Sequence, residues 1–256
     1  MGTDLLQEAK RLFIDELKSR MKDGLNEEDI KSEVVVSRPL SPVEALGDPE
    51  RDDFPILRGK EVLMQAVYRG CCGQAFTSHQ GSFRGTLGDV LRLPLLGGFE
   101  RAVLISTMNA VLRYYGLIEG TVHCRDGGPK RCGQCLVEWI GEQKWQDAER
   151  LGLIGLQPAL LEALVAAVGP ERVMVCDLAE AGSVRCGIAV QDGIDCQEIF
   201  ERCAVIFVTG SALANGTMDG LMESALRHKN RTILFGTTIS GPAYLLKLER
   251  WCPCST

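Results

Sequence analysis

The sequence predicts a mixed α/β protein in two parts, an α+β domain followed by a parallel sheet flanked by helices. Two observations carry this prediction. The 256 residues exceed the length of one typical domain. Near Asp147 the chain changes character, because short apolar runs begin to alternate with helical patterns, as they do in α/β sheets. We therefore place the two domains at residues 1–146 and 147–256.

The first part begins with an amphipathic helix, since apolar residues recur at helical spacing from Leu5 to Leu17. Three extended segments follow, and their spacing favours an antiparallel meander on which this helix packs. Thr86 is then placed to cap a short helix, and a long helix covers residues 99–115. The predicted strands span residues 33–37, 61–68 and 73–77.

The second part alternates apolar runs with helical patterns. The runs have the length of buried strands, and helices at residues 158–168 and 218–227 lie between them. This alternation is typical of a doubly wound parallel sheet, which binds ligands in the crevice beyond the carboxyl ends of its strands. The predicted strands span residues 151–154, 172–176, 204–208 and 231–235.

Small or acidic residues follow the first two of these strands. Gly155 lies in a glycine loop that lets the backbone approach a ligand, and Asp177 follows the loop by about 20 residues, where dinucleotide-binding folds place an acid for ribose hydroxyls. Tight packing of a strand on a helix also explains the glycines, and a solvated acid at a strand end also explains Asp177. Both residues are therefore ligand-binding candidates with an equally simple structural explanation.

Two later loops gather hydroxyls, an amide and glycines directly before helices. Backbone donors at such positions bind anions, so we expect an anion or another polar ligand here. Helix capping alone explains one such loop, but it explains the pair of loops less well. The residues expected to contact the ligand are Thr209, Gly210, Ser211, Asn215, Gly216, Thr217, Thr237 and Ser240.

The first part is expected to form the other wall of an interdomain cleft, because pockets gather at domain interfaces. Asn109 lies in a largely apolar helix, where a buried amide needs partners, either a ligand or the backbone of a neighbouring loop. Thr77 and Arg84 lie at and after a predicted strand and complete the set of candidate contacts.

The cysteine content predicts a second kind of site. Eleven cysteines without an export signal indicate reduced thiols and a cytoplasmic protein. Four soft ligands within thirteen residues suit zinc or an iron–sulfur cluster, although only one Cys-x-x-Cys pair is present. Cys252 and Cys254 join them only if the end of the chain folds back. The four ligands are His123, Cys124, Cys132 and Cys135.

The residues resemble those of a family described as putative heavy-metal chelation proteins. The matching segments are VTGSALANGT at residues 208–217, GQAFT at 73–77 with FRGT at 83–86, and NAVLRY at 109–114. The resemblance implies an enolase-amino-terminal-like domain followed by a Rossmann-like domain, an interdomain site and partial similarity to methyltransferases. It also implies a strand after the last helix, from which the short ending at residues 251–256 departs.

Three functions stay open. The resemblance implies a small-molecule-binding protein or enzyme of metal or cofactor metabolism, acting by condensation or hydrolysis in flavin-, pterin- or siderophore-like synthesis. The cysteines suggest instead a metal-binding or metal-delivery protein. The third alternative is a methyltransferase-like enzyme that grips an adenosyl methyl donor with the glycine loop and Asp177. The ligand classes are nucleotide-, pterin- or adenosyl-containing molecules.

A net charge of −6 gives no cationic field for nucleic acid, and no apolar run is long enough to cross a membrane, so neither is an expected partner. The sequence leaves catalysis and oligomeric state open, a homo-oligomer included.

Overall fold

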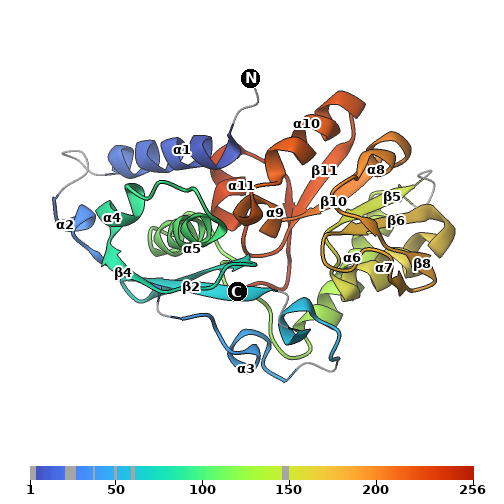
Figure 1. Cartoon of the computed structure of the whole chain (residues 1–256), viewed down its shortest axis with the longest axis horizontal. Coiled ribbons are helices and arrows are strands. Elements are labelled where there is room, and N and C mark those ends of the chain that lie inside the picture. The colour runs from blue at the N-terminus through green and yellow to red at the C-terminus, as the bar shows by residue number, and fades with distance from the viewer. Residues whose placement is uncertain (1–3, 21–26, 37, 49–50, 59–60, 146–149) are drawn as a thin grey trace.

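The computed structural model describes residues 4–20, 27–36, 38–48, 51–58, 61–145 and 150–256. It contains a four-stranded antiparallel sheet, a six-stranded parallel sheet and a two-stranded hairpin, with helices around them (Figure 1). The mixed α/β class predicted from the sequence is confirmed. The predicted boundary between residues 146 and 147 lies outside the described residues.

The antiparallel sheet has the strand order β3-β2-β1-β4. β2 and β3 form a hairpin whose turn residues, Arg69 and Gly70, both have positive φ, as a tight two-residue hairpin turn requires. β1 pairs with β2 and with β4, so the sheet is not a simple meander, and β4 is a strand that the sequence did not predict. The strands are β1 (Glu33–Val36), β2 (Val62–Tyr68), β3 (Cys71–Thr77) and β4 (Phe83–Thr86).

One long helix, α5 (Gly98–Tyr114), covers a face of this sheet, and α1 (Leu5–Arg20) lies across the far side of α5 (Figure 1). Gly73 of β3 lets strand and helix approach closely, because a Cβ there would lie 2.2 Å from the Ala110 nitrogen of α5. Thr86 caps α4 as predicted, accepting a hydrogen bond from the Asp89 amide at 3.1 Å. The short elements are α2 (Glu27–Ile30), α3 (Pro42–Leu46), η1 (Pro55–Arg58) and α4 (Leu87–Leu91).

The parallel sheet has the order β12-β11-β10-β5-β6-β9. If these six strands are numbered 1 to 6 in the order in which they occur along the chain, the order across the sheet, read from β9 to β12, is 3-2-1-4-5-6. This is the strand order of the Rossmann fold. β12 follows the last helix and pairs with β11, so the chain does have the further strand that the resemblance implies. The expected departure from this strand pattern was therefore wrong. The strands are β5 (Leu151–Ile154), β6 (Val173–Asp177), β9 (Gln191–Asp192), β10 (Val205–Thr209), β11 (Arg231–Phe235) and β12 (Arg250–Trp251).

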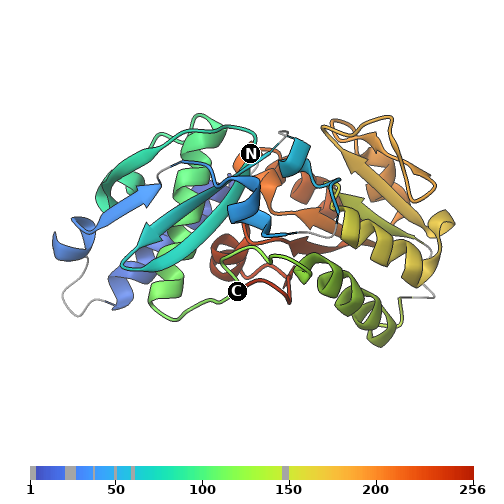
Figure 2. The same cartoon turned by 90° about the horizontal axis from the view of Figure 1, so that it is seen from below.

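Both faces of the parallel sheet are covered by helices. Leu153 and Phe207 point to the face packed by α6 (Gly128–Glu142) and α7 (Pro158–Val168), which lie side by side (Figure 2). α6 carries Cys132 and Cys135 of the predicted ligand set, and Pro129 lies in its first turn, where proline is favoured. The remaining elements are η3 (Pro170–Arg172), β7 (Val184–Arg185), β8 (Ile188–Ala189), α8 (Gln197–Arg202), α9 (Ser211–Asn215), α10 (Met218–His228) and α11 (Ser240–Leu246).

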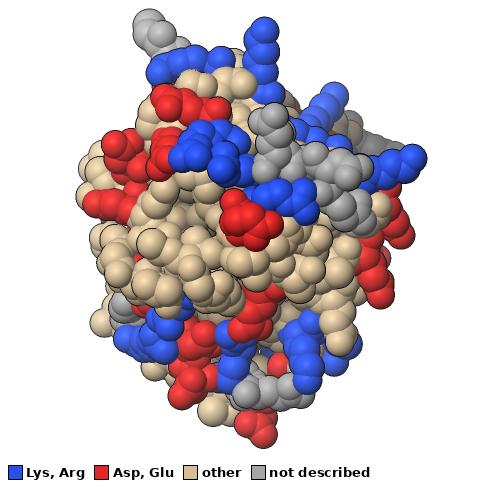
Figure 3. Space-filling view, turned by 90° about the vertical axis from the view of Figure 1, so that its right-hand side faces the viewer, with Lys and Arg blue, Asp and Glu red and all other residues tan. Residues whose placement is uncertain are grey.

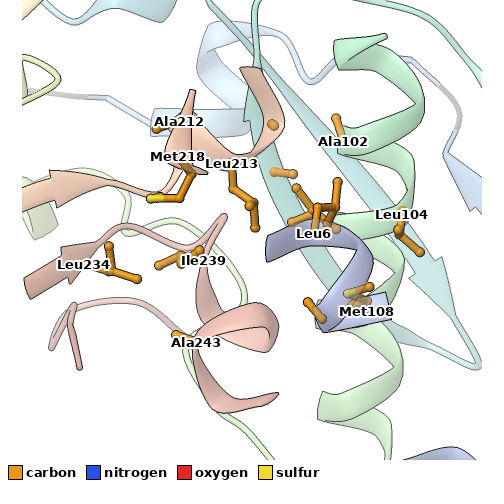
Figure 4. Packing of buried hydrophobic residues seen from close by; sticks show 14 of the residues in the cluster. Leu6, Ala102, Leu104, Met108, Ala212, Leu213, Met218, Leu234, Ile239 and Ala243 are labelled. Carbon is orange, nitrogen blue, oxygen red and sulfur yellow. The ribbon is translucent and has the colours of Figure 1, made fainter. Parts of the chain in front are cut away.

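A single hydrophobic cluster runs from the first part into the second. Leu6 of α1 packs among residues of α5, and the same cluster continues to Leu213, Ile239 and Ala243 of the second part (Figure 4). Because the two parts share this core, the side chains that they bring together at their interface hold fixed positions.

The outer surface of the parallel-sheet part carries both signs of charge. Lys and Arg lie interspersed with Asp and Glu around an uncharged central region, so this face presents no large field of one sign (Figure 3). No helix in the described ranges combines the length and the apolar character needed to cross a bilayer.

Candidate functional site

A pocket of about 450 Å³ lies between the two parts, at the carboxyl ends of the parallel strands. Its floor is formed by the residues that follow β5, β6, β10 and β11, and its opposite wall comes from the first part. β5 and β10 are neighbours in the sheet, and the strand order reverses between them. Open α/β sheets bind ligands at this switch point, and the pocket has the volume of a small-molecule site.

The pocket lining is mainly apolar, with a small number of polar side chains. Phe54, Ile56 and Phe76 supply apolar surface from the first part. Among the residues that the structure describes, no Lys or Arg lines the pocket, whereas the carboxylates Glu61 and Asp177 both do. The pocket is therefore apolar with a negative bias, which is unlike a site for phosphate groups.

Part of the predicted set meets at this pocket. These residues come from the loops after three parallel strands, as expected from the topology. The predicted residues that line the pocket are Gly155, Asp177, Thr209, Gly210, Ser211, Asn215 and Thr217.

Gly155 has a structural reason to be glycine. Its φ is +87°, and a Cβ at this position would lie 2.3 Å from Cγ2 of Thr209. Its amide donates to the carbonyl of Cys176 at 2.9 Å. The glycine thus lets the ends of β5 and β10 close together beneath the pocket.

The loop after β10 is not the anion cradle that the sequence predicted. The Gly210 amide donates to the Phe235 carbonyl at 2.9 Å, and the Thr217 amide donates to the Ala212 carbonyl at 2.9 Å. The Gly216 amide is bonded within the same loop, because the segment folds into the short helix α9 and Gly216 ends it with a φ of 78°. The loop therefore offers side-chain hydroxyls and an amide to the pocket, and Gly216 itself does not line it.

Asp177 organises two of the pocket loops. One carboxylate oxygen accepts the Leu156 amide at 2.7 Å, and the other accepts the amides of Ala179 and Glu180 at 2.7 and 3.0 Å. Asp177 thus holds the glycine loop after β5 against the loop after β6. Only its remaining lone pairs are available to a ligand.

Glu61 is a pocket residue that was not predicted from the sequence. It lies at the start of the segment leading into β2, lines the pocket and is only partly exposed. Burial is the main cause that raises the pKa of Glu61 to about 7, the negative charge of Asp177 adds to the rise, and a hydrogen bond with Ser211 opposes both. Its carboxyl group therefore exchanges a proton near neutral pH, which is a property of general acids and bases.

His123 also lines the pocket, where it was not expected. Its ring meets the edge of Phe76 with the centroids 5.3 Å apart. Burial lowers the pKa of His123 to about 4, so the imidazole is neutral at physiological pH. Its Nδ1 is buried and has no hydrogen-bond partner among the described residues, which leaves it free for a ligand or a water molecule.

Asn109 does not reach the pocket and instead joins the two parts. Its Nδ2 donates to the carbonyls of Gln74 and Thr237 at 2.9 and 3.0 Å and makes a longer bond to Thr238. Its Oδ1 accepts the Gly241 amide at 2.7 Å. The expectation of a buried amide with partners is met by backbone groups on both sides of the interface.

Four more predicted residues lie outside the pocket lining. Thr237 holds Asn109 through its carbonyl, and the hydroxyl of Ser240 donates to the carbonyls of Gly120 and Thr237. Thr77 is fully buried and donates to the Gly98 carbonyl at 3.3 Å. Arg84 is exposed on β4 and pairs with Glu33 of β1. These side chains serve the packing of the two parts or the edge of the antiparallel sheet.

The end of the chain folds back onto the cysteine segment. Val122 and Thr256 exchange two backbone hydrogen bonds, of 2.7 and 3.0 Å. This return places the last two cysteines beside α6, which carries Cys132 and Cys135. We refer to the resulting group as the cysteine cluster, which consists of Cys124, Cys132, Cys135, Cys252 and Cys254.

The thiols of the cysteine cluster affect one another. Burial, together with the nearby Cys252 and Cys254, raises the pKa of Cys124 to about 12, and the same causes raise the pKa of Cys132. His123 lines the pocket, whereas the neighbouring Cys124 is not part of the pocket lining. Among the described residues, no three His, Cys, Asp or Glu side chains already stand in the geometry of a metal site.

The fold and the pocket define a two-part α/β protein whose parallel sheet has the Rossmann strand order and carries an antiparallel domain over its carboxyl edge. Residues 142–247 match the family described as "Putative heavy-metal chelation" (DUF364). The resemblance predicted from the sequence is thereby confirmed for this part of the chain.

Two solved structures from the same family are similar to this chain. A protein of unknown function from Pyrococcus horikoshii is 16% identical, with a TM-score of 0.51 over 91% of this chain and 79% of its own. A protein of unknown function from Desulfitobacterium hafniense is 11% identical, with a TM-score of 0.48 over 94% of this chain and 84% of its own. At such identity the first likeness shows the fold alone. A comparison with curated proteins found no match.

Proposed function

We propose that the protein binds a small organic ligand in the pocket between its two parts and acts on it as an enzyme of cofactor or metal metabolism. The observation that carries this proposal is the position of Glu61. Its carboxyl group, with a pKa near 7, faces an apolar pocket at the switch point of a parallel sheet. A titrating acid in such a place is a strong indication of a working site.

The charge of the pocket selects among the ligand classes that the sequence left open. A dinucleotide brings a pyrophosphate, which needs free backbone amides or cationic side chains. The described lining has no Lys or Arg, and the amides of Gly210 and Thr217 are already bonded inside the fold. A neutral or positively charged heterocyclic ligand fits better, so we favour an adenosyl methyl donor or a pterin over a nucleotide.

Three side chains would do the chemical work. Glu61 would exchange a proton with the ligand, and Ser211 would hold the Glu61 carboxyl group in place by a hydrogen bond. His123 would bind a polar group of the ligand through its unpartnered Nδ1. The apolar walls from both parts would exclude water around them.

Calorimetric titration of the full chain tests this proposal. The probes are S-adenosylmethionine and tetrahydropterin, with NAD⁺ as the phosphate-bearing comparison. We expect one of the first two to bind at least tenfold more tightly than NAD⁺, and Glu61→Gln to weaken that binding. The matched control is Glu138→Gln on the exposed side of α6, which should bind like the wild type. Preferential binding of NAD⁺ would contradict the proposal.

The cysteine cluster supports a second function, the binding of a thiophilic metal ion. The supporting observation is the return of the chain end, which brings Cys252 and Cys254 to the thiols of α6 and Cys124. Thiolates select zinc, copper(I) or iron–sulfur clusters over hard cations. Because the sulfurs do not yet stand in ligand geometry, metal binding would require their side chains to rotate and lose their protons.

Metal analysis of protein purified without oxygen tests this second function. We expect close to one equivalent of zinc, or iron with sulfide, and its loss in Cys132→Ser and in Cys252→Ser. Cys203→Ser is the control, because Cys203 is buried against the parallel sheet away from the cysteine cluster. Metal-free protein, or metal retained in both cluster variants, would contradict this function.

A further inference from the structure

Two cysteines outside the cysteine cluster lie in direct contact, and one of them, Cys176, lines the pocket. The sulfurs of Cys176 and Cys196 are 2.6 Å apart, and both side chains are buried. Non-bonded heavy atoms pack at about 3.5–4.0 Å, and bonded sulfurs lie at about 2.05 Å. The two sulfurs are thus closer than packing alone produces, although both cysteines are free thiols in this structure.

The fold holds this pair at the base of a long connection. β9 pairs with β6 through only two residues, and the Gly193 amide donates to the Asp177 carbonyl at 3.2 Å. The Cys196 thiol then donates to the Gly193 carbonyl at 3.4 Å. Much of the connection is exposed, with Val184 67% and Ile194 84% accessible to solvent, while Val190 is buried in the hydrophobic cluster of the parallel sheet. The contact between the two sulfurs lies at the base of this mostly exposed segment.

We propose that Cys176 and Cys196 form a reversible disulfide, so that the pocket wall carries a redox switch. The proposal goes beyond the ligand and the metal proposed above and depends on neither. It is distinct from the cysteine cluster, because Cys176 lies at the end of β6 and lines the pocket, and Cys196 directly precedes α8.

The oxidation is a two-electron step with a peroxide as the oxidant. The Cys196 thiolate attacks one oxygen of the peroxide, the O–O bond breaks, and a sulfenic acid and hydroxide form. The Cys176 thiol then attacks the sulfenic sulfur, the S–S bond forms, and a water molecule leaves with the thiol proton. A dithiol reductant reverses the reaction by exchange.

The local chemistry assigns these two roles. The hydrogen bond with Cys176 lowers the pKa of Cys196, whereas that same contact and burial raise the pKa of Cys176. Cys196 is therefore the thiol that ionises first and reacts first, and Cys176 is the resolving thiol.

Disulfide formation would tie together two positions twenty residues apart. The closed loop carries Asp177 and Gly193, which both line the pocket. A disulfide at the base of this loop reduces the conformational entropy of the unfolded chain, so oxidation should stabilise the protein. The disulfide would also hold this side of the pocket in place, so oxidation should change the rate at which ligands enter.

The test uses the full chain with Cys186→Ser as background. Trypsin then yields residues 173–185, whose one cysteine is Cys176, and residues 186–202, whose one remaining cysteine is Cys196. The reduced protein is treated with hydrogen peroxide at a small excess, denatured in N-ethylmaleimide, digested and analysed by mass spectrometry. We expect the two peptides to appear linked, with the link removed by dithiothreitol.

Thermal unfolding gives the second readout. Oxidation should raise Tm by several degrees in the background protein and leave Tm unchanged in Cys176→Ser and Cys196→Ser, while Cys203→Ala behaves like the background. Both peptides carrying N-ethylmaleimide after peroxide treatment, with other thiols oxidised, would overturn the proposal. Because the peptide result is obtained on a protein that keeps both cysteines, it stands even if the serine variants fold poorly.

Discussion

Glu61 and Asp177 face the same pocket from the two different parts of the chain, and the charge of Asp177 contributes to a pKa of about 7 at Glu61. Asp177 is tied down by three backbone amides, so its negative charge is held in place. In the described part of the chain, Glu61 is hydrogen-bonded to the Ser211 side chain. The two carboxyl groups thus have different environments, which is how a pair of acids takes on separate roles.

Glu61→Gln should stabilise the protein at alkaline pH. The pKa of Glu61 is higher in the folded state than the value of about 4.3 in an unfolded chain. Ionising it therefore costs the folded state free energy, and this cost grows as pH rises from about 4.5 and levels off above about 7. We expect the stability of Glu61→Gln to exceed that of the wild type by up to about 3 kcal/mol at pH 8 and by only about 1 kcal/mol at pH 5.

Urea unfolding of both proteins at pH 5 and pH 8 measures this difference. Glu138→Gln on the exposed side of α6 serves as the control and should follow the wild type at both pH values. An equal effect of Glu61→Gln at the two pH values would show that Glu61 does not titrate in this range.

Asn109→Ala should reduce stability more than it reduces ligand affinity. The substitution removes the hydrogen bonds that Asn109 makes to buried backbone groups of both parts. We expect a loss of about 2–4 kcal/mol in the free energy of unfolding. Affinity per folded molecule should stay close to the wild-type value, because Asn109 does not line the pocket.

Asn215→Ala is the matched comparison for Asn109. Asn215 lines the pocket, and its Oδ1 accepts a long hydrogen bond of 3.4 Å from exposed Ser78. Asn215→Ala should therefore lower the affinity for the ligand with little change in Tm. The reverse pattern, with affinity depending on Asn109 and stability on Asn215, would refute the assignment of these two side chains.

Gly155→Ala should destabilise the protein more than Gly236→Ala. Both glycines have positive φ, +87° and +94°, so an added Cβ strains the backbone in each case. At Gly155 the Cβ also collides with Thr209, whereas nothing lies within 4 Å at Gly236. Thermal unfolding of the two variants should separate the collision from the backbone strain, and equal Tm losses would mean that the β5 and β10 loops move apart freely.

The buried strands could be predicted from the sequence because their signal is local. The apolar runs of β5, β10 and β11 each fill a central strand that is covered on both faces, and their predicted ranges agree with the structure to within one residue. β9 and β12 have two residues each and lie at the sheet edges, so they carry no apolar run. Such short edge strands depend on pairing with a neighbour and leave no pattern of their own.

The floor of the pocket was predictable for the same topological reason. Parallel strands end at one edge of their sheet, so residues such as Thr209 and Asp177 had to lie near each other. The opposite wall depends on how the first part packs on the second, which no local pattern encodes. Glu61 and His123 reach the pocket through that packing, and Cys252 reaches α6 through the return of the chain end.

Native mass spectrometry of the full chain, purified from cells without oxygen, shows directly whether the pocket holds a small organic ligand. We expect a bound molecule without phosphate groups, at close to one per chain. Ser78→Trp should remove it, because Ser78 is an exposed residue that lines the pocket and its enlarged side chain would fill the space. Ser82→Trp, at an exposed serine outside the pocket lining, should retain it. A phosphate-bearing molecule, or one that stays bound in Ser78→Trp, would contradict the proposed ligand site.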